Sequence, residues 1–557
     1  MQRVLASRWA VVVVIAVALG IGLHAVTTGF ITDDHVFRVL LHSTSGRAPA
    51  AWDLFRFSGG DPETTALAIR FGHTPWWTSP DFRIHFARPL TSLLFAFDDR
   101  VFGDNPVGYH LHSLVWFAAF LAAAAACLRR ILPHAVATVA LAVFAWHAGH
   151  SQAYAWPSAR HVLVAATPAL LALYARLCGR RWLSLALVIV AFAGSELALG
   201  IVPFLLAYEI LGPERNWRRC IPIVVLALAY LVAYHLLGFG VTDSAGYHDP
   251  LGDALGFMRV VPAHFFALLG DALLDVPAEL SNGNLAVVLV IVGVIATLAI
   301  AALWWWLCRS QTRQYAWVIA GTLGAVIIAT TGIPGGRVLA LANLGVAVVL
   351  ATLFDAALER GWLARIAVGL LALVHLVASP LRAWIDIDLL DQRGRASEAI
   401  AIEAVELARG RRLFVVAASD PFVFLYPRGI ASALDPGAIR CWSVLSAARS
   451  THRLERVDDH TFTLTALHRP LLMGFDSLFR RPDRAITDAA DQCGATIRVT
   501  ELDGGLPSTI EISFRRRLDD PELVFAAWRD GHLVRLELPA VGSAIELPWS
   551  PGPARFL

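Results

Sequence analysis

Two adjacent carboxylates, Asp33 and Asp34, follow the first long apolar segment of the chain. A carboxylate within hydrogen-bond reach of a hydroxyl group can accept its proton while the hydroxyl attacks another atom. The segment before the pair, from about Trp9 to Phe30, contains no Asp, Glu, Lys or Arg and is long enough to cross a bilayer. The sequence therefore places a candidate catalytic base at the level of the lipid head groups.

Basic side chains near the ends of other apolar segments could bind a phosphate group. Arg160 and Arg337, and less directly Arg88, could stabilise the charge that grows on a phosphate leaving group. Glu196 lies at a break between two short apolar segments, where a carboxylate is costly unless it is paired or functional. A structural ion pair and a substrate-binding role both fit Glu196.

A histidine pair, His147 and His150, ends another apolar segment. The i, i+3 spacing puts both rings on one face of a helix, where they suit capping and packing, phosphate binding or metal binding. We predict no cofactor and no set of metal ligands, and keep a divalent metal as an alternative.

Composition indicates a polytopic α-helical membrane protein. The 557 residues are 57% hydrophobic and only 16% charged, and the mean hydropathy is +0.59. The net charge of +2 gives no reason to expect nucleic acid as a partner. We predict about eleven spans, the first of them an uncleaved N-terminal segment. The other apolar segments cover about 107–128, 135–159, 161–175, 182–195, 197–211, 220–239, 284–307, 315–333, 338–354 and 363–380.

Arginine placement predicts the orientation, because short cytoplasmic loops collect positive charge. Arginines cluster in alternate loops, so we expect a cytoplasmic N-terminus and an extracytoplasmic C-terminus, with every candidate site residue on the outer side. The loops 31–106 and 240–283 are also placed outside. The clusters are Arg3 and Arg8; Arg129 and Arg130; Arg176, Arg180 and Arg181; Arg215, Arg218 and Arg219; Arg309 and Arg313; and Arg360 and Arg365.

The chain changes character at about residue 382, which predicts a transmembrane domain over 1–381 and an extracytoplasmic domain over 382–557. Strand-like runs at 413–417, 451–457, 461–467, 523–528 and 533–538 alternate with turn signals, and Asp530-Gly531 suits a type I′ hairpin turn. The segment 398–409, followed by Gly410, is expected to be a helix. These patterns favour an α+β or mostly β fold.

Cysteine placement agrees with this topology. Four cysteines (127, 178, 220 and 308) fall at predicted cytoplasmic ends, where thiols stay reduced. Cys441 and Cys493 fall in the outer domain, and we predict a disulfide between them with Cα atoms about 4.4–6.8 Å apart.

The segment before the second span shows helix signals. Asn105 suits an N-cap and Pro106 the first helical position, so the span should start there. Residues 91–102 are expected to form a short amphipathic helix along the interface, with Asp98, Asp99 and Arg100 toward water.

The order and spacing of several short motifs within residues 9–210 resemble the membrane part of GT-C glycosyltransferases. The resemblance is closest to the protein O-mannosyltransferase-like and TMTC-like branch. The resemblance implies an enzyme that moves a sugar from a polyprenyl-phosphate carrier to an extracytoplasmic acceptor, with the first-loop acid, Asp33 before Asp34, as base. The matching motifs are Asp33-Asp34, Arg88-Pro89-Leu90, Asn105-Pro106-Val107-Gly108-Tyr109-His110, His147 with His150, Trp156 with Arg160, Ser195-Glu196, and a weaker match at Arg337.

The chain departs from the family pattern at several positions. Gln152 and Ala148 stand where relatives typically carry Glu and Pro, Ser195 stands where they carry Lys, and Val338 and Leu339 replace aromatic residues. The tail has none of the helical repeats of TMTC proteins. These departures weaken the inference from the family to the sugar donor and, to a lesser degree, the inference to transferase activity.

Three functions compete at this level. The first is an inverting glycosyltransferase of the bacterial inner membrane, whose partners are a polyprenyl-phosphate sugar, membrane lipids and a protein, lipid or glycan acceptor. The second is a transporter or flippase for a lipid-linked sugar, which would carry charges through the depth of its spans. The third is an inactive relative that binds envelope components. The one-sided charge distribution favours the enzyme.

Overall fold

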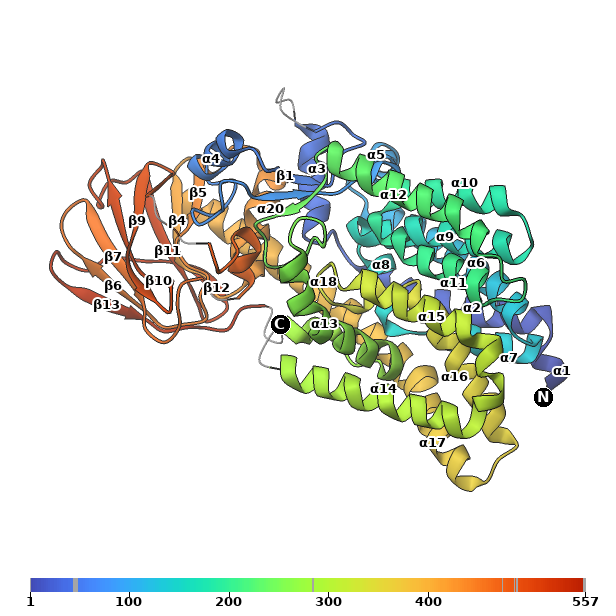
Figure 1. Ribbon diagram of the computed structural model, residues 1–557. Helices are drawn as coiled ribbons and strands as arrows, with labels where there is room; N and C mark the ends of the chain where they lie inside the picture. The colour runs from blue at the N-terminus through green and yellow to red at the C-terminus, as the bar shows by residue number, and fades with distance from the viewer. Residues whose placement is uncertain are drawn as a thin grey trace.

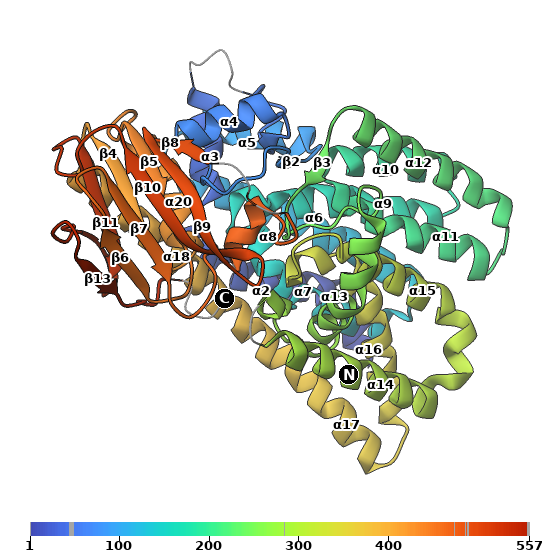
Figure 2. The same ribbon diagram turned by 60° about the vertical axis from the view of Figure 1, so that its left-hand side comes forward.

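The computed structural model describes residues 2–43, 49–282, 285–472, 474–484, 486 and 489–553. A helical bundle forms one side of the molecule and a β-rich C-terminal domain the other, as Figures 1 and 2 show. Within the described residues, seven helical segments are long and apolar enough to cross a membrane. The chain is therefore a multi-pass membrane protein.

The bundle contains long and short apolar helices. The long segments comprise α2 (Arg8–Gly22), α6 (Pro106–Ile131), α9 (His161–Leu177), α12 (Cys220–Leu236), α13 (Ala254–Leu274), α14 (Ala286–Cys308) with α15 (Thr312–Ala329), and α17 (Trp362–Leu373) with α18 (Ser379–Ala408). The shorter helices are α1 (Gln2–Leu5), α7 (His134–Ala145), α10 (Arg181–Gly194), α11 (Val202–Leu211) and α16 (Ala342–Leu358).

Two local predictions about these helices agree with the structure. α6 begins at Pro106, and the Asn105 side chain accepts a hydrogen bond from the Val107 N–H at 3.1 Å. The segment 182–211 breaks at Ser195, between α10 and the 3₁₀ turn η4 (Glu196–Ile201). The predicted span 135–159 is wrong in its second half, because α7 ends at Ala145 and short helical turns follow.

The predicted outer loop 240–283 contains a helix that we missed. α13 carries Arg259, Pro262 and Asp271, which lower its mean hydropathy to 1.4 and mask its apolar character. Its N-cap, Asp253, pairs with Arg481 of the C-terminal domain, and Asp275 just after its end pairs with Arg382.

The arginine-rich loops gather at the end of the bundle that holds the N-terminus, away from the C-terminal domain (Figure 1). There the Arg129 guanidinium donates to the Ala6 carbonyl oxygen at 3.4 Å. Buried Arg176 pairs with Glu209 at 2.6 Å and donates to the Arg219 carbonyl.

The C-terminal domain has an α+β fold with two sheets. One sheet, in the order β12-β11-β4-β5, has a parallel centre, and the other, in the order β13-β6-β7-β10-β9-β8, is antiparallel. Asp530 and Gly531 both have positive φ (52° and 89°), as the hairpin prediction requires. The strands are β4 (Arg412–Ala417), β5 (Cys441–Val444), β6 (His452–Arg456), β7 (Thr461–Ala466), β8 (Ala490–Gln492), β9 (Ala495–Asp503), β10 (Leu506–Phe514), β11 (Leu523–Arg529), β12 (His532–Arg535) and β13 (Ala544–Leu547).

A single helix, α18, joins the two parts of the molecule. We expected a helix to start at Glu398, but α18 starts at Ser379 and runs through the predicted boundary at 381/382. Its charged stretch stays helical because Arg382 with Asp386 and Arg395 with Asp391 form i, i+4 ion pairs. The C-terminal domain therefore follows directly from the last apolar helix, without a loop before it.

The first loop packs into the core of the C-terminal domain. It contains α3 (Asp33–His42), β1 (Arg56–Gly59), α4 (Pro62–Arg70), β2 (Arg83–His85) and α5 (Pro89–Phe102), and β1 and β2 form a sheet with β3 (Gly240–Thr242). The buried indoles of Trp76 and Trp77 donate to the carbonyl oxygens of Leu445 and Asp476.

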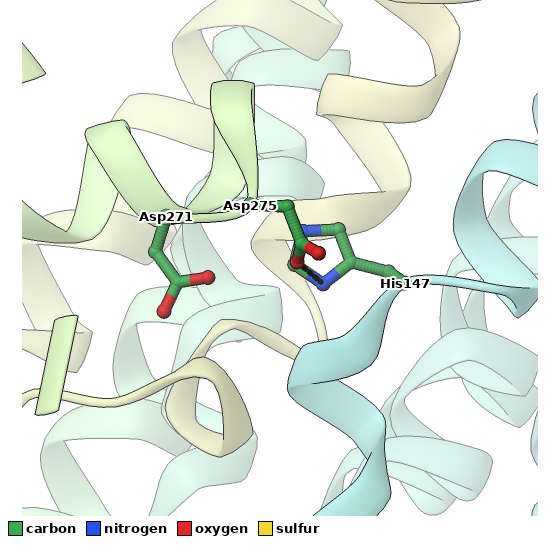
Figure 3. A group of neighbouring side chains, drawn as sticks. All are labelled: His147, Asp271 and Asp275. Atoms are coloured by element: carbon green, nitrogen blue, oxygen red, sulfur yellow. Dashed lines mark ion pairs between the residues drawn. The ribbon is translucent and has the colours of Figure 1, made fainter. Parts of the chain in front are cut away.

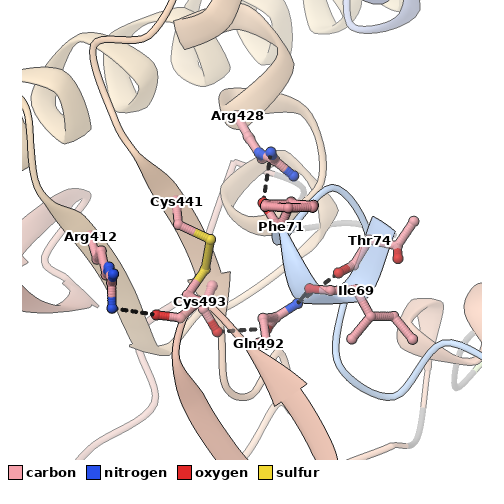
Figure 4. Close-up of a disulfide and its surroundings, with 9 residues drawn as sticks. Ile69, Phe71, Thr74, Arg412, Arg428, Cys441, Gln492 and Cys493 are labelled. Carbon is pink, nitrogen blue, oxygen red and sulfur yellow. Dashed lines mark hydrogen bonds between the residues drawn. A yellow bond between two sulfur atoms is a disulfide. The ribbon is translucent and has the colours of Figure 1, made fainter. Parts of the chain in front are cut away.

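The predicted disulfide between Cys441 and Cys493 is confirmed, with Cα atoms 5.6 Å apart. Figure 4 shows that it lies against the end of α4. The Gln492 amide donates to the carbonyl oxygens of Ile69 and Thr74, and the Cys493 N–H donates to that of Arg70. The disulfide therefore fixes the edge of the domain to which the first loop docks.

Candidate active site

The acid pair begins helix α3, and Asp34 fixes the position of that helix. Asp34 is fully buried and accepts hydrogen bonds from the N–H groups of Ile31 and Ser158 at 2.9 and 2.8 Å, and from the Ser158 hydroxyl. Burial raises the pKa of Asp34 to about 7, although these hydrogen bonds oppose the rise. Asp34 is thus the structural member of the pair.

Asp33 is partly exposed and makes no side-chain hydrogen bond within the described residues. Burial raises the pKa of its carboxyl to about 6, while the positive charges of Arg337 and Arg88 lower it. The preceding residue, Thr32, has a φ of 42°, a region that β-branched residues rarely adopt. Strain of this kind persists where surrounding structure imposes it, often beside functional groups.

Arg337 lies on the 3₁₀ turn η8 (Gly336–Leu339) and keeps an uncompensated charge. Its guanidinium donates to the Gln152 side-chain oxygen at 3.1 Å and lies 5.8 Å from the centre of the Trp156 ring. Among the described residues it forms no ion pair. The Trp156 indole donates to the Ile31 carbonyl, so the same side chain contacts both the segment before Asp33 and Arg337.

Arg88 and Glu196 form a bidentate ion pair. Arg88 Nε donates to Glu196 at 3.0 Å, a second nitrogen donates to the other carboxylate oxygen, and the guanidinium stacks on Phe55 and Phe86. The Ser195 hydroxyl also donates to Glu196 at 3.2 Å. Glu196 thus offsets the charge of Arg88, which leaves Arg337 as the stronger candidate to bind an anion.

Arg160 lies elsewhere, in a buried ion pair. Its side chain is 2% exposed, pairs with Asp98 at 2.6 Å and donates to the Ser113 hydroxyl at 2.9 Å. Asp98 is fully buried, so the expectation that it faces water from an interfacial helix is wrong. The structure uses Arg160 to hold α5 against α6, and we leave it out of the proposed phosphate site.

The two histidines also point into the protein. His150 is enclosed by the rings of Phe117, Phe120 and Phe144, with centroids 5.0–6.2 Å away, and burial lowers its pKa to about 3. His147 faces Asp275, with 3.5 Å between the imidazole nitrogen and the carboxylate. His150 therefore has a packing role, and His147 belongs to a different cluster.

Two tyrosines near Asp33 were missed at the level of the sequence. Tyr247, from the loop after β3, packs against Phe86 at 5.4 Å, and Tyr426 begins α20 (Tyr426–Leu434) of the C-terminal domain, which packs against α3. Burial raises the pKa of both hydroxyls, and the Asp33 charge contributes in the same direction. No local pattern marks either tyrosine, since only long-range packing brings them to α3.

A small apolar pocket adjoins Arg337. Its other lining residues are Val162, Ala165, Ala166, Leu197, Val338, Ala340 and Leu341. A cation beside aliphatic side chains suits a ligand that joins an anionic group to a hydrocarbon chain.

The sequence matches no known protein family and no curated protein closely enough to indicate kinship. The structure is similar to ArnT from Cupriavidus metallidurans bound to undecaprenyl phosphate, at 14% identity and a TM-score of 0.38, over 78% of this chain and 89% of ArnT. The apo state of ArnT matches at 13% identity and a TM-score of 0.39, over 77% of this chain and 88% of ArnT. The Archaeoglobus fulgidus oligosaccharyltransferase tethered to an acceptor peptide matches at 10% identity and a TM-score of 0.39, over 78% of this chain and 64% of the oligosaccharyltransferase chain. With scores below 0.5, the functional argument rests on the residues of this chain.

Proposed function

We propose that the protein is a membrane glycosyltransferase that moves a sugar from a polyprenyl-phosphate carrier to an acceptor hydroxyl outside the cytoplasm. The observation that carries the proposal is the division of roles within the acid pair. Asp34 is held by three hydrogen bonds, while Asp33 makes no side-chain hydrogen bond within the described part of the chain and lies within electrostatic reach of Arg337. A base and an anion-binding group at one place are what displacement at an anomeric carbon requires.

In this mechanism Asp33 takes the proton of the acceptor hydroxyl as its oxygen attacks the anomeric carbon. The bond from that carbon to the phosphate oxygen breaks, and the electron pair leaves with the polyprenyl phosphate. Arg337 stabilises the phosphate charge, and the aliphatic side chains beside it, such as Val338 and Leu341, offer an apolar contact for the lipid end of the carrier. A single in-line displacement of this kind inverts the anomeric centre.

Arg88 and Glu196 serve the site as a pair. Because the guanidinium is neutralised and stacked on two rings, we assign it to positioning α5 and η4 rather than to holding the phosphate alone. Gln152 keeps Arg337 in place without cancelling its charge, which a carboxylate at that position would do.

The test is binding of polyprenyl phosphate, the product shared by all donors of this class, to the full-length protein in lipid nanodiscs by native mass spectrometry. We expect Arg337→Gln to weaken binding by about tenfold or more, since a hydrogen bond to a charged group contributes about 1.5–3 kcal/mol. The control is Arg409→Gln, an exposed arginine that pairs with Asp435 in the C-terminal domain. Equal binding by wild type and Arg337→Gln would overturn the assignment.

A further inference from the structure

A second cluster of ionisable side chains lies where the turn after α7 meets the end of α13. His147, Asp271 and Asp275 are 3%, 0% and 8% exposed, and Figure 3 shows the His147 ring against the Asp275 carboxylate with Asp271 beside them. The ligand atoms that they offer all lie within 4.8 Å of one another. The site proposed above does not use this cluster.

The cluster carries more negative charge than its protein neighbours neutralise. Arg382 lies 3.0 Å from Asp275, 3.8 Å from Asp271 and 3.3 Å from Asp386, so three carboxylates share one guanidinium. If all ionise, three negative charges less one positive charge leave an excess of two. Buried charges without partners are expensive, and they are normally compensated by a cation or a proton.

The hydrogen bonding leaves free coordination positions. Asp271 accepts from the Ala278 N–H through Oδ2, while its Oδ1 has no hydrogen-bond partner within the described residues. Oδ1 of Asp275 and Nε2 of His147 also lack hydrogen-bond partners there, although Asp275 keeps its ion pair with Arg382. The other imidazole nitrogen, Nδ1, faces Asp275 and accepts a hydrogen bond from the Gly149 N–H at 3.1 Å. Unsatisfied polar atoms at three adjacent, buried side chains call for a ligand.

We propose that His147, Asp271 and Asp275 bind a divalent transition-metal ion, Zn²⁺ or Mn²⁺. One imidazole nitrogen and two carboxylate oxygens form a donor set that suits either ion. Ligand atoms bound to one tetrahedral ion at about 2.0–2.2 Å lie about 3.3–3.6 Å apart. The most widely separated of the three ligand atoms would therefore close by up to about 1.5 Å to reach coordination range, with Arg382 beside the ion.

The bound ion would hold the turn that carries Arg337. Asp271 anchors the start of the 3₁₀ turn η6 (Ala278–Asn282) through the Ala278 N–H. From the same turn, Glu279 accepts hydrogen bonds from the Gly336 N–H at 3.1 Å and from Gln152 at 3.2 Å. Gly149, two residues after His147, packs against Gly336 so closely that a Cβ on Gly336 would lie 2.4 Å from the Gly149 Cα. The ion thus has a positioning role, separate from the transfer chemistry.

The test is titration of the metal-free, full-length protein in detergent with Mn²⁺, read by electron paramagnetic resonance. We expect one tightly bound Mn²⁺ per chain, displaced by Zn²⁺, and a higher thermal midpoint in its presence, because a ligand of the native state stabilises it. Asp271→Asn should weaken Mn²⁺ binding by about tenfold or more and abolish the thermal shift. The variant keeps an oxygen for the Ala278 N–H, and its midpoint without metal reports whether it folds.

The matched control is Asp386→Asn, which removes a carboxylate that also contacts Arg382 but lies outside the triad. It should weaken Mn²⁺ binding much less than Asp271→Asn does, because it removes a nearby negative charge but no ligand. Absence of binding up to about 1 mM Mn²⁺ or Zn²⁺ would overturn the proposal. Equal weakening by Asp271→Asn and Asp386→Asn would also overturn it, because diffuse negative charge rather than the triad would then attract the ion.

Discussion

Replacing each member of the acid pair by Asn separates catalysis from structure. Asp33→Asn removes the proton acceptor from a side chain that makes no hydrogen bond within the described residues, so the fold should lose less than about 0.5 kcal/mol. The transfer rate should fall by a factor of about 10²–10⁴, the usual contribution of a general base. That factor corresponds to about 2.7–5.4 kcal/mol in the activation free energy.

Asp34→Asn should give the opposite result. The Asn oxygen can still accept from Ser158, but its amide group faces the Ile31 N–H, so one donor opposes another. Losing a hydrogen bond to a charged acceptor costs about 1.5–3 kcal/mol of stability. The rate measured below the lowered unfolding temperature should change less than in Asp33→Asn.

The assay follows consumption of polyprenyl-phosphate hexoses by mass spectrometry, alongside thermal unfolding of each variant. Near-normal turnover by both variants would refute the proposed mechanism. A well-folded but inactive Asp34→Asn beside an active Asp33→Asn would exchange the two roles.

Three more predictions follow from the site and the topology. The sugar-transfer rate should rise with pH and be half-maximal near pH 6, because Asp33 accepts a proton only when ionised and its pKa is raised to about 6. A transfer rate that falls across pH 5–7 would exclude Asp33 as the base. A membrane-impermeant thiol reagent should label a cysteine introduced at Leu251, which is 62% exposed in the segment 240–283, but not one at Ser310, and the reverse result would invert the orientation. Cys493→Ser opens a disulfide that spans 52 residues and should destabilise the C-terminal domain by about 2–4 kcal/mol, seen as earlier unfolding and faster proteolysis under oxidising conditions; an unchanged unfolding curve would contradict this.

Local signals in the sequence were sufficient wherever a feature depends on neighbouring residues. The start of α6 follows from Asn105 and Pro106, and the hairpin between β11 and β12 follows from Asp530-Gly531, since capping and turn geometry involve only a few consecutive positions. Local charge was misleading in α13 and in the first half of α18. There, ion pairs such as Arg382 with Asp275 let charged residues lie within long helices.

The sequence by itself determined the class of the protein, many of its apolar segments, the acid pair and the position of the two bonded cysteines. Only the tertiary structure decided what each charged side chain does. Arg160 pairs with buried Asp98, which lies 62 positions away in the chain. Ser158 binds Asp34 through its N–H and its hydroxyl, whereas Asp33 makes no side-chain hydrogen bond within the described residues. The nearest partners of a charged side chain and its exposure to water determine whether it is available to a ligand. In this protein those partners come from distant parts of the chain.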